Sequence, residues 1–371
     1  MRLRAPDLDA WHMAHALDLA ERGRGAVEPN PLVGCVIARG AEIIGLGWHR
    51  RFGGPHAEIE ALAVAGERAA GATMYVTLEP CCHHGKTPPC TRAIIAAGIN
   101  RVVAAQRDPF PAVSGGGFAE LQAAGIEVLA GVGEAAARRI NAPYLKLLAT
   151  GRSWLIAKWA MTLDGKLATR TGHSRWISSE ASRRVVHELR GRVDAIMVGR
   201  RTVEADDPLL TARPSGPRQA TRIVVDSRAS LASESQLVRT AGEAPVLLAA
   251  GPSAAAADIR RLETAGCEVF VASSPEPGER LEALLDELGR RRMTNVLVEG
   301  GAKLLGSCFD RRLIDEVHVF VAPKIAGGAA APGPVGGSGI ERMDEALRFD
   351  EAEWRQLDGD LYLTGRVAKS P

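Results

Sequence analysis

The chain has 371 residues, more than a single hydrophobic core usually organises, so we expect two domains. Hydrophobic residues make up 46% of the chain and charged residues 24%, ordinary values for a globular protein that argue against broad disorder. Lys and Arg total 46 against 44 Asp and Glu, a net charge of +2, and no long run of one sign indicates a nucleic-acid or anionic membrane partner.

The start of the chain predicts neither a secretory signal nor a membrane span. Asp7, Asp9 and His12 stand where a signal peptide would carry its apolar core. No apolar stretch reaches the roughly 18 residues of a transmembrane helix, since even residues 37–46 are interrupted by charges. We therefore expect a cytoplasmic protein with no membrane partner.

Helical and strand patterns alternate along the first 150 residues. They predict, in chain order, a helix from Asp9, its N-cap, to Gly23, strands over 32–38 and 43–48, a helix over 56–65, a strand over 73–78, a helix over 90–97, a strand over 101–105 and a helix over 135–150. This alternation is typical of a layered α/β domain. The last helix ends at Gly151, so we expect domains at 1–150 and 151–371.

A second series of elements begins after this boundary. Apolar runs predict strands over 154–161, 195–198, 223–225, 246–249, 296–298 and 317–321, with helices over 179–190 and 278–292. A second α/β domain is the simplest interpretation. Residues 327–339, rich in Gly, Ala and Pro, predict a surface loop, and we find no internal repeat.

Three of the six cysteines lie close together, as Cys81, Cys82 and Cys90, which indicates a metal site rather than a disulfide scaffold. With His56 they offer the ligands that zinc prefers, and three protein ligands would leave the fourth tetrahedral position open to solvent, as in catalytic sites. His56 and Cys90 each follow a proline at a predicted helix start. Because a helix N-terminus lowers the pKa of a thiol, we expect Cys90 to bind as a thiolate.

Glu58 stands two residues after His56, near enough to the metal to move protons without binding it. A His-x-Glu followed by Pro-Cys and a second Cys is the pattern of zinc nucleobase deaminases, although their cysteines are usually closer than Cys81 and Cys90. A closed structural zinc site is the alternative, but it would have no use for Glu58. The other cysteines lie in apolar segments and are expected in the core, namely Cys35, Cys267 and Cys308.

The segment over 80–90, PCCHHGKTPPC, resembles the deaminase half of the bifunctional riboflavin biosynthesis enzymes. The similarity includes NPLVG at 30–34 and GWH at 47–49, while Cys82 departs from it, because Ser is usual there. The resemblance implies an N-terminal cytidine-deaminase-like three-layer domain with Glu58 as the catalytic acid and base. It implies zinc bound by His56, Cys81 and Cys90. It further implies that the pyrimidine or its ribose phosphate contacts Asn30, His49, His83 and Lys86.

The second half has no Rossmann fingerprint. The best candidate for a phosphate-binding turn is VEGGAKLLG at 298–306, where a strand ends in glycines and a helix begins. Taken alone, a plain strand-to-helix connection is the more frequent explanation of such a turn. Arg190 and Arg213 suit a sugar phosphate, because a guanidinium can bind phosphate through two parallel hydrogen bonds.

Residues 157–322 resemble the reductase half of the same family, through TLDGK at 162–166, SRWI at 174–177, VEADDPLLT at 203–211, VDS at 225–227 and EGG at 299–301. The resemblance implies a C-terminal dihydrofolate-reductase-like α/β domain. NADPH would contact Ala160, Trp176, Thr202, Asp206, Ser227, Gly301, Ala302, Lys303, Leu304, Leu305, Gly306 and Ser307. The substrate would contact Lys158, Ser174, Arg190, Leu210, Arg213 and Glu299.

The resemblance implies two successive reactions on a small phosphorylated pyrimidine. The first removes an amino group by zinc-dependent hydrolysis, and the second reduces the ribose to a ribityl chain with NADPH. A homo-oligomer formed through the reductase domain is also implied. Three alternatives stay open, namely a deaminase of another nucleoside or tRNA base, a chain with only one active half, and a zinc-stabilised scaffold without activity. The first would need neither a reductase half nor Lys86.

Overall fold

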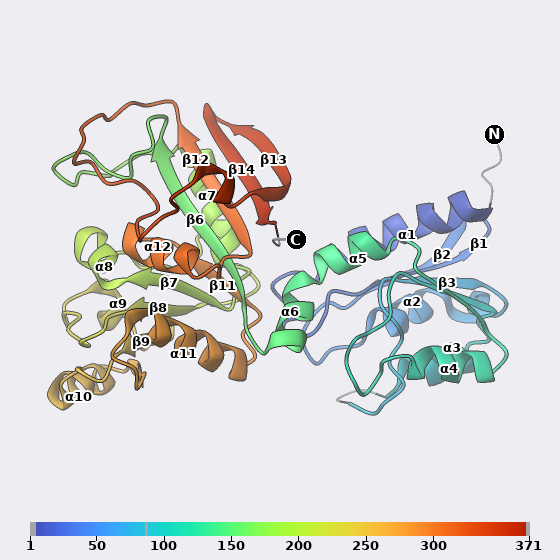
Figure 1. Ribbon diagram of the computed structural model, residues 1–371. Helices are drawn as coiled ribbons and strands as arrows, with labels where there is room; N and C mark the ends of the chain where they lie inside the picture. Colours follow the sequence, from blue (N-terminus) through green and yellow to red (C-terminus); the bar gives the residue numbers. More distant parts are fainter. Residues whose placement is uncertain (1–4, 86–87, 369–371) are drawn as a thin grey trace. The chain divides into compact units, whose positions relative to one another are not determined.

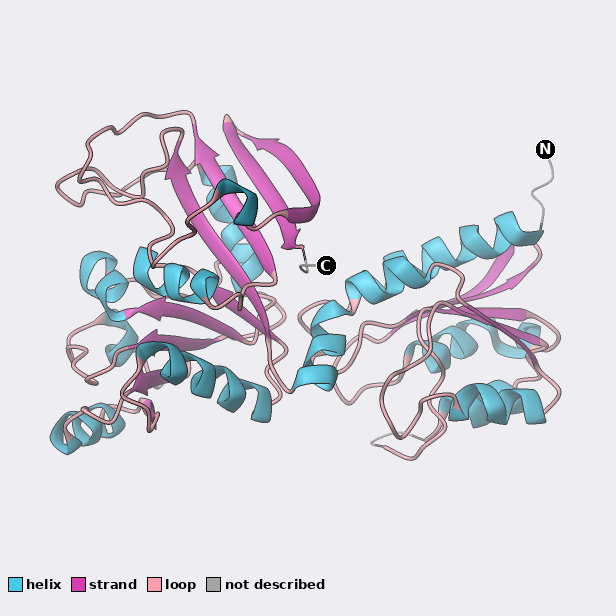
Figure 2. Cartoon of the chain, viewed as in Figure 1, coloured by secondary structure: helices cyan, strands magenta, loops and turns pink. Residues whose placement is uncertain are grey.

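The computed structural model describes residues 5–85 and 88–368 of the chain (Figure 1). Contacts divide the chain into two compact units, Met1–Gly151 and Arg152–Pro371. Both units are α/β, with helices packed on the two faces of a single sheet (Figure 2). Among the described residues, no helix has both the length and the apolar character needed to cross a membrane.

The first unit is a three-layer sandwich. Its elements are α1 (Ala5–Glu21), β1 (Gly34–Arg39), β2 (Glu42–Trp48), α2 (Ala57–Ala65), η1 (Gly66–Ala69), β3 (Thr73–Val76), α3 (Cys90–Ala96), β4 (Arg101–Ala104), α4 (Gly116–Ala123), β5 (Glu127–Ala130), α5 (Glu134–Ile140) and α6 (Ala142–Thr150). The sheet has the order β2-β1-β3-β4-β5, antiparallel from β2 to β3 and parallel from β3 to β5. Figure 1 shows α1 and α5 on one face and α2, α3 and α4 on the other.

Alternation along the strands builds the two cores of this unit. Ile37 and Met74 face α2 and α3, whereas Val36 and Tyr75 face α1. Gly47 lets α2 lie directly on β2, because a Cβ atom there would be 2.2 Å from the carbonyl oxygen of Ala57. The absence of a side chain at Gly47 therefore lets α2, the helix that begins beside His56, pack closely against the sheet.

The second unit is larger and contains a sheet of nine strands. Its elements are β6 (Trp154–Thr162), α7 (Glu180–Arg190), β7 (Ala195–Gly199), α8 (Arg200–Asp206), β8 (Thr221–Val225), α9 (Gln236–Arg239), β9 (Val246–Ala250), α10 (Ala256–Thr264), β10 (Glu268–Val271), α11 (Pro277–Arg290), β11 (Asn295–Val298), α12 (Ala302–Asp310), β12 (Glu316–Ala322), η2 (Met343–Glu345), β13 (Phe349–Leu357) and β14 (Asp360–Val367). The sheet order is β10-β9-β8-β7-β11-β6-β12-β14-β13. All strands up to β12 are parallel, and β14 and β13 complete the sheet as an antiparallel hairpin.

Helices α11 and α12 cover one face of this sheet, and α7 lies on the other. Leu284 and Leu305 pack on the first face, and Val186 packs on Phe320 and Tyr362 on the second. Because all the parallel strands point the same way, their carboxyl ends lie along one edge. The connections that leave this edge are where ligands bind in sheets of this kind.

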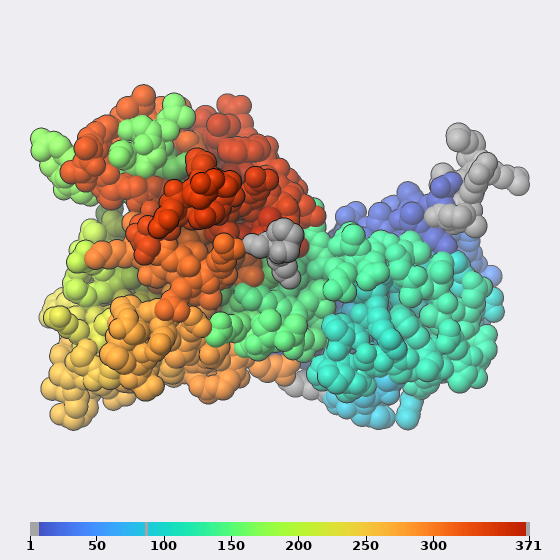
Figure 3. All heavy atoms as spheres, viewed as in Figure 1, coloured from blue at the N-terminus to red at the C-terminus, as the bar shows by residue number. Residues whose placement is uncertain are grey.

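The residues over 327–339 form a loop without helix or strand, as predicted. The Asp164 carboxylate accepts hydrogen bonds from the backbone N–H groups of Ala326 and Gly327, and Leu167 N–H donates to the oxygen of Pro332. Figure 3 shows green atoms of the segment that follows β6 against the orange loop. Hydrogen bonds therefore hold the segment that follows β6 against the loop that follows β12.

Three details of the predicted elements are wrong. Asp9 lies inside α1 instead of capping it, because its carboxylate accepts hydrogen bonds from Tyr75 and Arg101. The helix expected over 135–150 is two helices that meet at Asn141. The Asn141 amide bonds both the N–H and the carbonyl oxygen of Leu32, at 2.7 and 2.9 Å, which keeps Leu32 out of the sheet. The strand predicted from Leu32 therefore begins at Gly34.

Candidate functional sites

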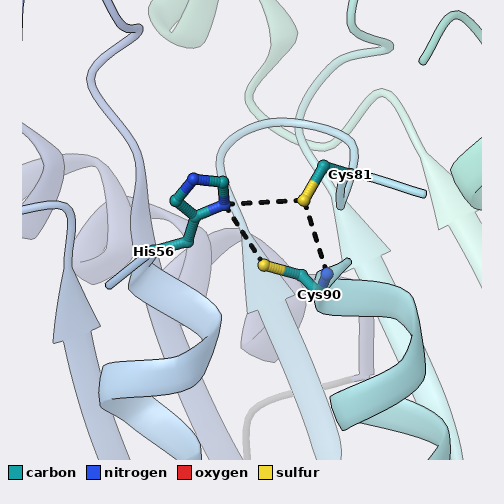
Figure 4. Close-up of side chains that lie close together, drawn as sticks. All are labelled: His56, Cys81 and Cys90. Atoms are coloured by element: carbon teal, nitrogen blue, oxygen red, sulfur yellow. Dashed lines mark hydrogen bonds between the residues drawn. The ribbon is translucent and has the colours of Figure 1, made fainter. Parts of the chain in front are cut away.

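Two helix starts and one loop bring His56, Cys81 and Cys90 together. His56 is the N-cap of α2, Cys90 is the first residue of α3, and Cys81 lies in the loop after β3. The Nδ1 atom of His56 is 3.5 Å from the Sγ atom of Cys81 and 3.3 Å from that of Cys90 (Figure 4). Ligand atoms on a tetrahedral zinc ion stand about 3.5–3.8 Å apart. Both the donor types and their spacing therefore fit zinc.

Within residues 5–85 and 88–368 this is the one cluster of at least three such side chains that could hold a metal ion. The adjacent thiol of Cys82 lies outside it and points to the carbonyl oxygen of Ala112 at 3.8 Å. Thr91 secures the loop, because its N–H donates to the oxygen of Cys81 at 3.2 Å and its hydroxyl donates to the Glu120 carboxylate at 2.9 Å. Sequence reasoning missed Thr91, since a threonine in the first turn of a helix has no distinctive signal.

The thiols of Cys81 and Cys90 have pKa values shifted in opposite directions. The hydrogen bond with Cys90 lowers the pKa of the Cys81 thiol to about 4, although burial opposes the shift. The same hydrogen bond and burial raise the pKa of Cys90. Without a metal ion, contact with Cys81 thus outweighs the effect of the helix start on the pKa of Cys90, and the thiolate expected of Cys90 on zinc stays a prediction.

Glu58 lies on the first turn of α2 and is 3% exposed. Its Oε2 atom has no hydrogen-bond partner among the described residues. Burial raises the pKa of Glu58, and the nearby His56 acts in the opposite direction. A buried carboxylate oxygen without a protein partner beside a metal site is suited to hydrogen-bond a ligand.

Two of the predicted substrate contacts flank the metal site. His49 is buried, and its Nδ1–H donates to the carbonyl oxygen of Pro55 at 2.9 Å. Its Nε2 atom then accepts a hydrogen bond from the Asn30 amide at 3.3 Å. The rings of His49 and His56 are 5.4 Å apart, so Asn30 and His49 border the metal ligands.

The remaining predicted contacts follow Cys81 in the loop. The Nδ1 atom of His83 is buried, and within the described part of the chain it has no hydrogen-bond partner. Its ring lies 5.8 Å from that of Phe110. Lys86 lies outside the described residues.

A cavity of about 610 Å³ opens at the carboxyl edge of the sheet in the second unit. Twelve of the predicted cofactor and substrate residues line it, namely Lys158, Ala160, Ser174, Trp176, Arg190, Thr202, Asp206, Leu210, Arg213, Glu299, Gly301 and Leu305. The other predicted contacts are not among its lining residues, namely Ser227, Ala302, Lys303, Leu304, Gly306 and Ser307. The cavity therefore gathers residues from distant parts of the sequence, from Lys158 to Leu305.

An ion pair forms the floor of this cavity. The Glu299 carboxylate, 5% exposed, accepts two hydrogen bonds from the Arg190 guanidinium at 2.6 and 2.8 Å, and Lys158 Nζ is 3.9 Å away. Burial opposes ionisation of Glu299, but Arg190 and Lys158 outweigh it and lower its pKa. Burial lowers the pKa of Lys158. Of the two arginines predicted to bind a sugar phosphate, Arg190 pairs with the Glu299 carboxylate, whereas Arg213 is exposed.

The turn after β11 meets α8, the helix that follows β7, at the side of the cavity. The Gly301 N–H donates to the Thr202 hydroxyl at 3.0 Å, and α12 begins one residue later. A helix start of this kind offers unpaired N–H groups to a phosphate. Its place beside the lining residues favours the phosphate-binding interpretation over a plain connection.

Trp176 stands at the edge of the cavity and is 65% exposed. The Arg183 guanidinium lies 4.6 Å from the centre of its ring. Lys324 holds the backbone of this segment, because its ammonium donates to the carbonyl oxygens of Trp176 and Ile177 at 2.7 and 2.9 Å. Sequence reasoning did not single out Lys324, which lies in a loop of no recognisable pattern.

Two protein-family models match the chain. The model for the RibD C-terminal domain matches residues 153–363, and the model for the cytidine and deoxycytidylate deaminase zinc-binding region matches residues 6–106. The riboflavin biosynthesis protein RibD of Actinobacillus pleuropneumoniae is 39% identical over 368 residues, which is 98% of this chain and 96% of that protein. Its counterpart in Escherichia coli (strain K12) is 40% identical over 370 residues, covering 96% and 98%.

Solved structures agree with these relatives. Acinetobacter baumannii RibD, form 1, has a TM-score of 0.86 and 36% identity, covering 98% of this chain and 100% of that one. The diaminohydroxyphosphoribosylaminopyrimidine deaminase/5-amino-6-(5-phosphoribosylamino)uracil reductase of Thermotoga maritima has a TM-score of 0.84 and 33% identity over the same shares. These matches confirm the predicted cytidine-deaminase fold and dihydrofolate-reductase-like fold. The chain belongs to the RibD family, whose members are bifunctional deaminases and reductases of riboflavin biosynthesis.

Proposed function

We propose that residues 1–150 form a deaminase domain that acts on 2,5-diamino-6-ribosylamino-4(3H)-pyrimidinone 5′-phosphate. Hydrolysis would remove the 2-amino group as ammonia. The single observation that carries the proposal is the cluster of His56, Cys81 and Cys90 beside the unpartnered carboxylate oxygen of Glu58. The name of the Thermotoga maritima relative indicates the substrate class.

A zinc ion held by these three side chains would supply the Lewis acidity that activates water at neutral pH. The protein's own part is proton transfer. Glu58 would take a proton from the attacking water and deliver it to the departing amino group. Asn30, His49, His83 and Lys86 are proposed to hold the pyrimidine and its ribose phosphate. The hydrogen bond between Asn30 and His49 supports a shared role for the two.

We further propose that residues 151–371 form a reductase domain that acts on 5-amino-6-(5-phosphoribosylamino)uracil. NADPH would supply the hydride that converts the ribose to a ribityl chain. Lys158, Arg190 and Glu299 form the polar floor on which the sugar is oriented, and Ser174, Leu210 and Arg213 complete the proposed substrate contacts. The other contacts predicted from the resemblance would hold the cofactor along the carboxyl edge of the sheet.

An assay with the phosphorylated diaminopyrimidine tests both activities. Purified protein with stoichiometric zinc is expected to release ammonia and then to oxidise NADPH. A strong chelator should abolish ammonia release and leave NADPH oxidation with the deaminated substrate unchanged, because the cluster lies in the first unit alone. Release of ammonia from cytidine instead would favour the nucleoside deaminase. Metal binding without any ammonia release would favour the inactive scaffold.

A homo-oligomer formed through the reductase domain is also proposed, in the cytoplasm. Strand β13 supports it, because the strand ends the nine-stranded sheet and is exposed along nearly its whole length. Trp354 in this strand is 61% exposed. Light scattering after size exclusion should give an oligomer, and Trp354→Glu should shift it toward the monomer. A wild-type monomer would contradict the proposal.

A further inference from the structure

The order of the strands fixes where each end of the cofactor would lie. Hydride transfer requires the nicotinamide to meet the substrate, at the floor formed by Lys158 of β6 and Glu299 after β11. The predicted contacts then follow the sheet outward, from Thr202 after β7 to Ser227 after β8. The adenosine half of an extended dinucleotide would therefore reach the ends of β8 and β9.

Arg280 of α11 lies at this place. Its Nη2 donates to the Ser227 hydroxyl at 3.0 Å, and its Nη1 donates to the carbonyl oxygens of Ser274 and Pro275. Its side chain crosses the end of β9, where a Cβ atom on Gly251 would be 2.9 Å from its Cδ. The guanidinium is thus held at the edge of the sheet by neutral groups.

Among the described residues, no ion pair neutralises the charge of the Arg280 guanidinium. Across the described residues Arg280 makes no ion pair, and its hydrogen bonds use three of the five guanidinium N–H groups. The nearby Asp226 carboxylate is already engaged, because it accepts from the N–H groups of Leu231 and Arg228 and lies 3.6 Å from Arg200. The Arg280 guanidinium therefore has no paired counter-ion among the described residues, and two of its N–H groups make no hydrogen bond there.

We propose that Arg280, together with the Ser227 hydroxyl, binds the 2′-phosphate of NADPH and so selects NADPH over NADH. The 2′-phosphate is the only group that distinguishes the two cofactors, and it sits on the adenosine ribose. A guanidinium with free N–H groups binds a phosphate through parallel charge-assisted hydrogen bonds. The inference rests on the proposed reductase function and adds the residue that sets its cofactor specificity.

The test compares adenosine 2′,5′-bisphosphate with adenosine 5′-monophosphate by titration calorimetry on the full chain. The wild type should prefer the bisphosphate, and Arg280→Met should reduce the ratio of the two affinities about 10- to 100-fold. Arg280→Lys, which keeps the charge but not the fork of donors, should give an intermediate ratio. The ratio of kcat/KM for NADPH and NADH should fall in parallel.

Arg290→Met is the matched control, because Arg290 lies on the last turn of the same helix and is 72% exposed. It should leave the affinity ratio at the wild-type value. Equal weakening of both nucleotides by Arg280→Met, or no preference in the wild type, would overturn the inference. A lowered ratio without any ribose reduction would instead refute the proposed reductase function alone. Ribose reduction with an unchanged ratio would refute only the role of Arg280.

Discussion

Replacing Glu58 with Gln is expected to lower the rate of ammonia release about 10²- to 10⁴-fold. The amide has the shape of the carboxylate but cannot carry a proton from water to the leaving amino group. Glu58 is not one of the clustered metal ligands, so zinc content should stay stoichiometric. Ammonia release and bound zinc are measured on the same preparation, with the phosphorylated diaminopyrimidine as substrate.

Glu60→Gln is the control for this change. Glu60 lies on the same turn of α2, but its carboxylate pairs with Arg50 at 3.2 Å instead of facing the metal ligands. The control should release ammonia at the wild-type rate. If Glu58→Gln kept normal ammonia release, Glu58 would not be the proton carrier. If the variant lost its zinc, Glu58 would act in metal binding instead.

The metal site could be predicted from the sequence because its ligands come from short, recognisable segments. His56 and Cys90 each begin a helix after a proline, and the helix starts set where their side chains point. What the sequence could not predict is how the two thiols divide their protons. That outcome depends on a contact of Cys90 with Cys81, which only the folded chain creates.

The residues that come together in the cavity of the second unit were harder to predict from the sequence. Residues such as Lys158 and Glu299 meet only because β6 and β11 are neighbours in the sheet, although they are far apart in the chain. Arg280 and Lys324 act through contacts with distant loops, and neither lies in a recognisable motif. The resemblance identified twelve of the lining residues, whereas the contacts of Arg280 and Lys324 are apparent only in the folded chain.

The hairpin of β13 and β14 was missed for a different physical reason. The apolar residues of β13, FDEAEWRQL, do not alternate regularly with polar ones and most of them are exposed, so the segment lacks the pattern of a strand with one buried face. A shift of register between Asp350 and Glu353 disturbs the pattern further. The strand forms because it pairs with β14, whose Tyr362 and Leu363 are buried.

Glu299→Gln should destabilise the second unit and abolish its reductase activity. The change leaves the Arg190 guanidinium and the Lys158 ammonium, only 13% and 16% exposed, without their counter-ion. Losing one partner of a buried ion pair costs about 3–5 kcal/mol of unfolding free energy. Amide hydrogen exchange in peptides that cover β11 and α7 measures the loss, and ammonia release from the first unit should be unaffected.

Glu282→Gln is the matched control, since Glu282 pairs with Arg152 and Arg311 but is 34% exposed, so its loss should cost less than about 1 kcal/mol.

The pH dependence of the exchange rates separates the effect of the charge of Glu299 from the effect of its shape. Because the folded protein lowers the pKa of Glu299, the ion pair contributes stability above the ordinary value of 4.5 and loses it as the pH falls through the lowered pKa. At that acidity the protonated wild type and Glu299→Gln should exchange at similar rates, although they differ widely near neutral pH. A difference that persisted in acid would mean that the glutamine disturbs packing, and the cavity floor would then depend on shape instead of charge.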